Sequence, residues 1–391
     1  MYDTVPMTVA VRLASRIANR PSRVASEPAT PPAVVASRRR SVCASLAVVV
    51  LAGVIGGSRA RAEDGAAPTP APDAIGGRRV GDTGLWLGGY ASLEAEVPRS
   101  GPATLQIGDL GLLARWELTP TLALFNETDL EDTVTLVEAQ GLERGSRVLL
   151  LERLYLEWAA TPEFSVRFGK FLTPFGIWNV VRRAPLTWTV DRPVATQNAF
   201  PDHTTGASLV WQTTRHGWTV DATAYGQAQD ELVRGASDIS ATAVGGARAV
   251  AAHTIGPAYL AIGTSAIGFR DVDTHEWETS YGADVDLTFR RNQLTGEFAY
   301  THLREARASR EWGLYLQDVV PLWREVYGVF RYEHVVTPEG RSSNGELVGL
   351  AWRPTAHLVL KADYQFVDHP GAPSERSALE RGFVASVTVF F

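Results

Sequence analysis

The chain has 391 residues, of which 45% are hydrophobic and 20% charged, with a formal net charge of −6 and a mean hydropathy of −0.06. These values exclude a helical membrane protein, because residues 42–55 form the one long apolar run, and a spanning helix needs about 20 residues. They do not exclude a membrane β-barrel, whose strands are apolar at every second position and average to a neutral hydropathy.

The first 62 residues have the pattern of an export signal. Arg38, Arg39 and Arg40 precede the apolar run, and Ala60 and Ala62 are small residues at the positions that a signal peptidase reads. We expect cleavage after Ala62, followed by a flexible periplasmic lead-in over residues 63–79, which are rich in Ala, Pro and Gly. An uncleaved anchor helix is the alternative, which the short apolar run disfavours.

The chain that follows this signal is acidic and contains no cysteine. Removing residues 1–62 removes nine arginines, Asp3, Glu27 and the lone Cys43, which leaves 28 basic and 41 acidic residues and a net charge of −13. A negative field of this size argues against nucleic acid as a partner. Without cysteine, this part of the chain depends on neither disulfides nor thiol chemistry.

From residue 80 onward the hydrophobic pattern predicts β-strands. Apolar and polar residues alternate with a period of two over residues 281–290, 326–334 and 357–366. Seven short turns alternate with eight longer polar connections, so fifteen connections join sixteen strands. Fourteen or eighteen strands stay open, because residues 122–129 and 242–255 alternate less regularly. This topology predicts an all-β fold, a transmembrane antiparallel β-barrel of the outer membrane over residues 80–391.

The turns and the longer connections are identified by their composition. The short turns are expected at Thr119-Pro120, Thr161-Pro162, Arg215-His216-Gly217, Gly256-Pro257, Arg291-Asn292, Pro321 to Trp323 and Pro354-Thr355. The longer connections are expected near 96–103, 130–147, 172–204, 227–240, 270–275, 304–309, 337–344 and 368–380.

Aromatic residues and the carboxyl terminus agree with a barrel. Amphipathic rings are most stable at headgroup depth, and six tryptophans lie close to short turns: Trp116, Trp158, Trp211, Trp218, Trp323 and Trp352. A soluble β-sandwich is the alternative. The last strand carries one apolar face and ends on an aromatic residue, which resembles the signal read by the outer-membrane barrel assembly machinery: Phe383, Val387, Val389 and Phe391.

The sequence predicts no enzyme, cofactor or bound metal. Residues 263–267, centred on Ser265, depart from the nucleophile-elbow pattern at the last position, and His275-Glu276 lacks the second histidine of a zinc-helix motif. The acidic residues between 271 and 278 could hold a divalent cation, although an acidic solvated loop explains them more simply. The pair Asp202-His203 is interpreted as a loop feature.

The third long connection, Leu172 to Thr204, follows a strand that ends at Phe171. Residues 168–176, with the sequence FGKFLTPFG, resemble the motif that follows a strand in outer-membrane porins of the phosphate-selective O/P type and their relatives. The resemblance is specific over these nine residues and otherwise consists of the topology and the terminal phenylalanine. It implies that the third extracellular loop folds inward and narrows the pore, and that the protein is a homotrimer.

Charged residues give the candidate site. The pore constriction is assigned to loop residues Arg182, Arg183, Asp191 and Arg192, because fixed cations at a narrow point would favour anions; a solvated loop or lipopolysaccharide contacts are the alternative. On the lipid face a charge costs ~2–4 kcal/mol near the midplane, so pore lining is assigned to Arg115, Glu117, Arg153, Glu157, Arg167, Asp221, Asp284, Asp286, Glu297, Arg331, Glu333, Lys361 and Asp363. The mixed signs and the two lysines depart from the phosphate-selective pattern, so phosphate is not predicted as the solute.

The sequence thus predicts a passive porin for small hydrophilic solutes, with anions as candidates, in the outer membrane of a Gram-negative bacterium. The alternatives are an outer-membrane barrel hydrolase and a non-conducting structural or adhesive barrel. The expected partners are outer-membrane lipid and lipopolysaccharide, the barrel assembly machinery, periplasmic chaperones and further copies of the chain.

Overall fold

The computed structural model describes residues 77–131, 134–143, 148–197, 199–230, 239–303, 310–337, 340–368 and 382–391. The predicted export signal and most of the predicted lead-in lie outside these residues. Within the described ranges, no helix has the length and apolar character needed to cross a membrane.

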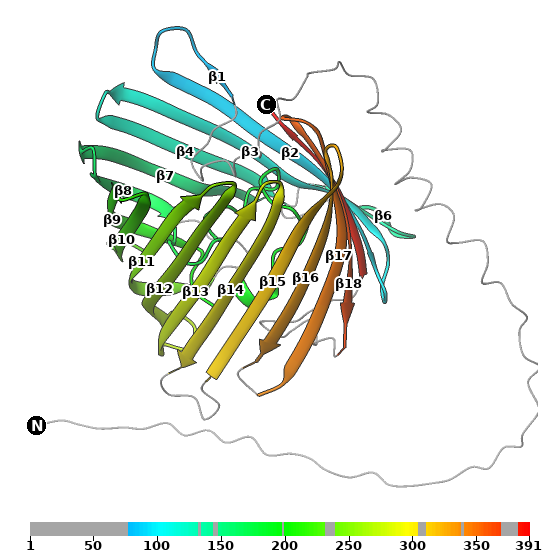
Figure 1. Cartoon of the computed structure of the whole chain (residues 1–391). Coiled ribbons are helices and arrows are strands. Elements are labelled where there is room, and N and C mark those ends of the chain that lie inside the picture. The colour runs from blue at the N-terminus through cyan, green and yellow to red at the C-terminus, as the bar shows by residue number, and fades with distance from the viewer. Residues whose placement is uncertain are drawn as a thin grey trace, which may run out of the picture. The chain divides into compact units, whose positions relative to one another are not determined.

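Sixteen antiparallel strands of the described chain form a closed wall (Figure 1). They are β2 (Leu85–Pro98), β3 (Thr104–Thr119), β4 (Leu122–Glu131), β7 (Val148–Thr161), β8 (Phe164–Leu172), β9 (His203–Arg215), β10 (Trp218–Gln227), β11 (Ala241–Ile255), β12 (Ala258–Asp271), β13 (Trp277–Phe289), β14 (Asn292–Leu303), β15 (Arg310–Trp323), β16 (Val326–Val336), β17 (Ser342–Thr355), β18 (Leu358–Val367) and β19 (Gly382–Phe390). Each strand pairs with the next, and β19 pairs with β2 through Phe383↔Val97 and Val389↔Ala91. The predicted count of sixteen and the barrel fold are confirmed.

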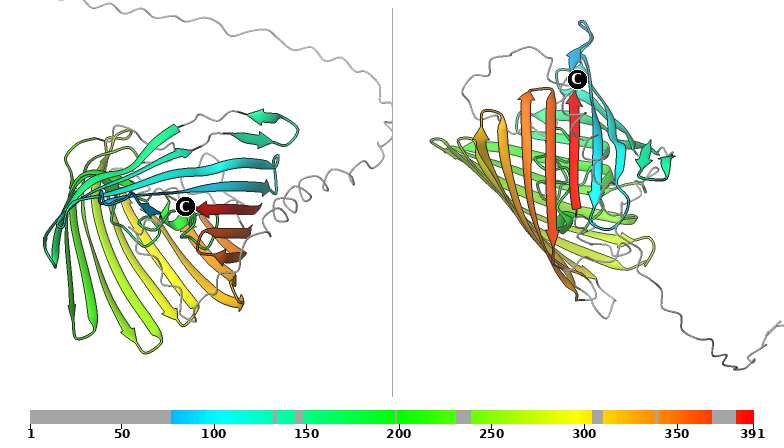
Figure 2. Two further views of the ribbon diagram at one scale, coloured as in Figure 1. Left: turned by 90° about the horizontal axis from the view of Figure 1, so that it is seen from above. Right: turned by 90° about the vertical axis from the view of Figure 1, so that its right-hand side faces the viewer.

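Three short strands lie outside this ring. Strand β1 (Arg78–Arg79) pairs with Trp86 and Leu87 of β2, so pairing begins inside the segment predicted as a lead-in. Strands β5 (Thr135–Val137) and β6 (Gly141–Glu143) form a hairpin that pairs with the start of β3 and projects beyond the wall (Figure 2).

The outer face of the wall is mostly apolar, and the inner face carries the charges. On β3 the exposed Leu112 and Trp116 alternate with the buried Leu113 and the less exposed Arg115. This alternation follows from the two-residue period of a strand and suits lipid outside and water inside. Five of the six predicted interface tryptophans are exposed: Trp116, Trp158, Trp211, Trp218 and Trp323.

Two turns were predicted two residues too early. Strand β15 continues through Pro321 to Trp323, and its turn is Arg324-Glu325; β17 continues through Pro354 to Thr355. The register shifts at both prolines, between Pro321 and Trp323 and between Trp352 and Thr355. A bulge accommodates a residue that has no N–H to donate, so a proline near a strand end does not have to mark the turn.

The carboxyl terminus completes the closure of the barrel. Phe391 and Gly89 exchange two backbone hydrogen bonds of 2.8 and 2.9 Å, and the Phe391 ring covers Gly89, where a Cβ would lie 2.8 Å from it. Val389 and Phe391 are exposed on the outer face, while Phe383 and Val387 are half-buried there. Recognition of these four residues by the assembly machinery stays a prediction.

The Gly169→Ala substitution is expected to destabilise the barrel by at least about 1 kcal/mol. Gly169 has a φ of +132°, and an added Cβ would lie 2.1 Å from the carbonyl oxygen of Leu154 on the paired strand. The measurement is the urea midpoint of unfolding from lipid vesicles, followed by tryptophan fluorescence. Gly226→Ala is the matched control, because Gly226 faces open space; equal losses in both variants would contradict this account.

Candidate functional site

The loop between β8 and β9, residues 173–202, folds into the barrel and is called the third loop below. It contains a short 3-10 turn, η1 (Val194–Thr196), which contacts β14, β15 and β16 on the far side of the lumen. Figures 1 and 2 show this green segment inside the wall. The predicted inward fold of the loop is confirmed.

The FGKFLTPFG motif forms the point where the third loop turns inward. Phe175 stacks on Phe200 from the other end of the loop, with ring centroids 4.2 Å apart. Glu297 of β14 accepts hydrogen bonds from the backbone N–H groups of Ile177 (2.9 Å) and Trp178 (2.8 Å). Gly176 makes this approach possible, because a Cβ there would lie 2.0 Å from Glu297 Oε2.

Cations of the wall hold the middle of the third loop. The Lys361 ammonium on β18 donates to Ala184 O (2.9 Å), Thr187 Oγ1 (2.8 Å) and Thr189 O (2.8 Å). Arg353 on β17 donates to Pro185 O (3.0 Å) and Thr187 O (2.9 Å). Buried carbonyl groups need partners where water is excluded, and these cations supply them.

Carboxylates of the wall accept from the same loop. Asp363 accepts from the Val190 N–H at 2.7 Å, and Glu333 accepts from the Val194 N–H at 2.7 Å. Arg331 lies 2.7 Å from Glu333. Five predicted pore-lining residues therefore face the lumen but bind the loop or each other there: Glu297, Arg331, Glu333, Lys361 and Asp363.

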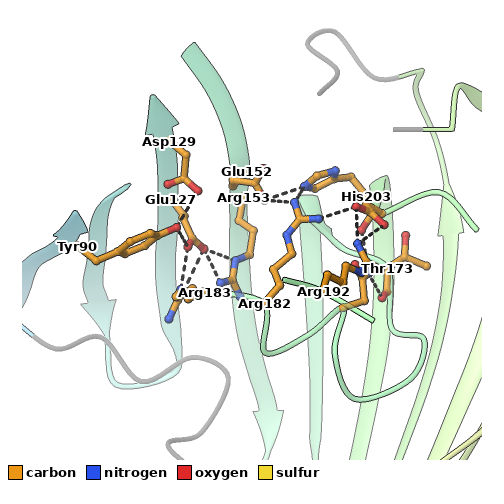
Figure 3. A network of polar contacts seen from close by, with 12 residues as sticks. Tyr90, Glu127, Asp129, Glu152, Arg153, Thr173, Arg182, Arg183, Arg192 and His203 are labelled. Carbon is orange, nitrogen blue, oxygen red and sulfur yellow. Dashed lines mark hydrogen bonds and ion pairs between the residues drawn. The ribbon is translucent and has the colours of Figure 1, made fainter. Parts of the chain in front are cut away.

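The predicted constriction arginines are joined to carboxylates of the opposite wall (Figure 3). Arg183 contacts Glu127 of β4 through bonds of 2.7 and 3.1 Å, and Arg153 of β7 bonds the same carboxylate. Arg182 bonds Glu152 of β7. The cationic charge of these residues is therefore compensated locally.

A second part of this network lies where the third loop ends. Asp202 accepts from Arg182 at 2.7 Å and from Arg192 at 2.9 Å. Burial of Asp202 would raise its pKa, but Arg192 and then Arg182 lower it more, so the pKa lies below its usual range. Its ionised form is therefore favoured, and its contribution to stability is lost as the pH falls through that lowered value. Asp191, the fourth predicted constriction residue, accepts from Arg331 through its backbone oxygen at 3.0 Å.

Sequence reasoning did not find four members of the network: Glu127, Asp129, Glu152 and Tyr90. The register shifts between Glu127 and Thr128 where β4 meets β7, so Glu152 and its neighbour Arg153 are both buried on the lumenal side. Strict alternation would have placed Glu152 on the lipid face. The strand 122–129, one of the two whose alternation is less regular, contains the other two acids.

Two of the cavities that adjoin the third loop are lined by charged residues. The first, of about 300 Å³, is lined by the arginine–carboxylate network just described. The second, of about 560 Å³, lies against β7 to β11, and its lining includes Arg153, Glu157, Arg167, Asp221 and Thr223. Arg167 is 2.6 Å from Glu157.

The remaining predicted pore-lining residues also face inward, away from the exposed apolar positions. Arg115 lies 4.0 Å from both Glu117 and Glu157. Asp284 accepts from Arg248 at 2.6 and 2.9 Å, and Asp286 accepts from a glutamine of β14 at 3.0 Å.

The residues considered for catalysis or metal binding have structural partners. Ser265 accepts from Arg248 at 2.9 Å and from the Gly176 N–H at 3.3 Å, and His203 contacts Glu152 at 3.0 Å. Asp271 accepts from two backbone N–H groups of its own turn. Among the described residues, no group of three or more His, Cys, Asp or Glu side chains could hold a metal ion.

Comparison with known proteins shows the fold. No family model matches the chain. A relative from Aquifex aeolicus (strain VF5), described as an uncharacterized protein, is 32% identical over 120 residues, which are 30% of this chain and 26% of the relative. The chain thus aligns with about a quarter of that relative's length.

Several solved structures share the barrel. OmpT, an outer membrane protein of Vibrio cholerae, gives a TM-score of 0.54 at 12% identity and covers 80% of this chain and 99% of its own. The outer membrane channel DcaP of Acinetobacter baumannii gives 0.52 at 10% identity, covering 81% and 100%. The anion-selective porin from Comamonas acidovorans gives 0.50 at 12% identity, covering 78% and 98%. The fold of this chain is that of outer-membrane proteins of Gram-negative bacteria.

Lys361→Met is expected to lower the free energy of unfolding by about 1–3 kcal/mol, because three loop oxygens lose a charged donor and keep at most the Thr187 hydroxyl in its place. It should also make the third loop more sensitive to protease than in the unchanged protein. Urea unfolding and limited proteolysis of the protein in vesicles measure the two effects. Arg310→Met removes an exposed cation and is the control; a loop equally resistant in both variants would rule out the anchoring role.

Proposed function

We propose that this protein is a passive outer-membrane channel for small hydrophilic solutes. The observation that carries the proposal is a closed barrel whose inner wall holds its charges around a folded loop and two cavities. Charged side chains replace part of a solute's hydration, while the loop sets a size limit. Several proteins with the same fold are described as channels or porins.

We propose that the open path lies beside β7 to β11. The third loop lies against the wall from β14 to β18, and the charged side chains of that wall hydrogen-bond the backbone of the loop. The charged pair Arg167 and Glu157 instead lines the larger cavity, at 26% and 20% side-chain exposure. Solute would therefore pass between the third loop and this wall.

The arginines of the third loop give little reason for anion preference. Each of the three is bonded to a carboxylate, which compensates much of its charge locally. We propose a weakly selective pore in place of an anion-selective one, and no bound cofactor or metal is part of this function.

The apolar outer face of the barrel suggests its surroundings and its partners. An outer-membrane barrel with an apolar outer face is proposed to contact outer-membrane lipid and lipopolysaccharide, and to use periplasmic chaperones and the barrel assembly machinery during insertion. A homotrimer is proposed by likeness to OmpT of Vibrio cholerae, one structure of which is described as a trimer form. An enzymatic function is the rival, and loss of a hydrolytic activity on Ser265→Ala would favour it.

The purified protein in a planar bilayer is expected to give stepwise conductance, which Thr223→Trp should reduce. Thr223 lines the larger cavity, so an indole there would occupy the proposed path. Ala224→Trp is the matched control, because the next residue of β10 is exposed on the outer face. A folded barrel that never conducts would refute the channel, and equal effects of the two variants would refute the path.

Ion selectivity provides a separate test of the path. Under a KCl gradient the unchanged protein should show a permeability ratio close to one. Arg167→Gln should shift the reversal potential toward cation preference, and Glu157→Gln toward anion preference, because each change leaves the partner's charge uncompensated. Shifts in one common direction, or none, would show that ions do not pass this pair.

A further inference from the structure

The short turns joining β9 to β16 form a basic arc on one rim of the barrel. The residues of this arc are Arg215, His216, Arg290, Arg291 and Arg324. All five are exposed. The hairpins β13–β14 and β15–β16 are neighbours in the sheet, and the hairpin β11–β12 separates them from β9–β10. Among the described residues of these turns, Glu325 is the acidic one, and it lies 3.8 Å from Arg291.

Three residues of this arc occupy strained backbone positions. His216, Arg290 and Arg324 have φ values of +53°, +56° and +42°, each as the first residue of a two-residue turn. Such turns favour Gly, Asn or Asp at a positive φ. The neighbouring turn between β11 and β12 has a glycine at the same place, Gly256, with a φ of +57°. The turn geometry therefore does not call for a basic residue, and a cation there costs stability.

The arginines lie directly beside exposed aromatic rings of the outer face. The Arg290 guanidinium is 5.5 Å from the ring centroid of Phe289, and that of Arg324 is 5.1 Å from that of Trp323. Phe289 is 46% exposed and Trp323 is 66% exposed. Aromatic rings at the ends of membrane strands lie at headgroup depth, so these guanidinium groups reach the layer of lipid phosphates.

Neither of the two strained arginines has an internal charge partner. Within the described ranges, Arg290 and Arg324 form no ion pair with a carboxylate. A guanidinium presents a planar set of donors that matches phosphate oxygens. We propose that the basic arc binds the headgroups of anionic phospholipids in the leaflet at the short-turn end, and that its strained cations are retained for that contact.

The test compares unfolding in vesicles of phosphatidylcholine with unfolding in vesicles that also contain phosphatidylglycerol. The unchanged protein should gain stability from the anionic lipid. For the double variant Arg290→Asn with Arg324→Asn, the factor by which anionic lipid raises the folding equilibrium constant should be smaller by roughly fivefold for each arginine removed. In phosphatidylcholine alone the same variant should be more stable than the unchanged protein, because asparagine tolerates a positive φ.

Two controls separate the headgroup contact from other effects. Arg99→Asn with Arg270→Asn removes two exposed arginines near the opposite rim and should keep the full gain from anionic lipid. Inorganic phosphate added to phosphatidylcholine vesicles should give no comparable gain; an equal gain would assign the arc to a soluble anion. A double turn variant that keeps the full lipid-dependent gain, or an unchanged protein that shows none, would overturn the proposal.

Discussion

The structure depends on the contact between the backbone of the third loop and the charged residues of the inner wall. A loop inside a barrel exposes many N–H and C=O groups in a space where water is limited. Lys361 and Arg353 donate to its carbonyl groups, while Glu297, Glu333 and Asp363 accept from its N–H groups. One wall of the lumen thus holds the loop, and the proposed path lies beside the other wall for this reason.

The strands were predictable because the outer and inner faces impose opposite requirements on alternate residues. This constraint acts on every strand of the wall, so one irregular strand hardly changes the number of strands predicted. Turn positions were less certain, since Pro321 and Pro354 lie in bulges that continue their strands. A proline in the sequence is compatible with a bulge and with a turn, because neither place needs a backbone N–H from that residue. The proline alone therefore cannot tell the two apart.

The candidate site was predictable in residue type more than in role. The charged residues assigned to pore lining lie on inner strand faces, and their role in a pore stays a prediction. The sequence pattern could not show which of them would bind the loop. That distinction depends on contacts across more than 100 residues, such as the one between Glu297 and Trp178. The adjacent inward pair Glu152 and Arg153 depends on a register shift between β4 and β7, which neither strand encodes alone.

The same residue type acts differently at the two places where arginines gather. In the lumen, Arg182, Arg183 and Arg192 each form an ion pair with a carboxylate, and these ion pairs hold the third loop in one conformation. On the rim, Arg290 and Arg324 contact aromatic faces and are exposed at the surface. A buried arginine without a partner would be costly, whereas an exposed one is tolerated. Pairing therefore distinguishes arginines that fix the fold from arginines available to a partner, and this difference places the inferred lipid contact on the rim.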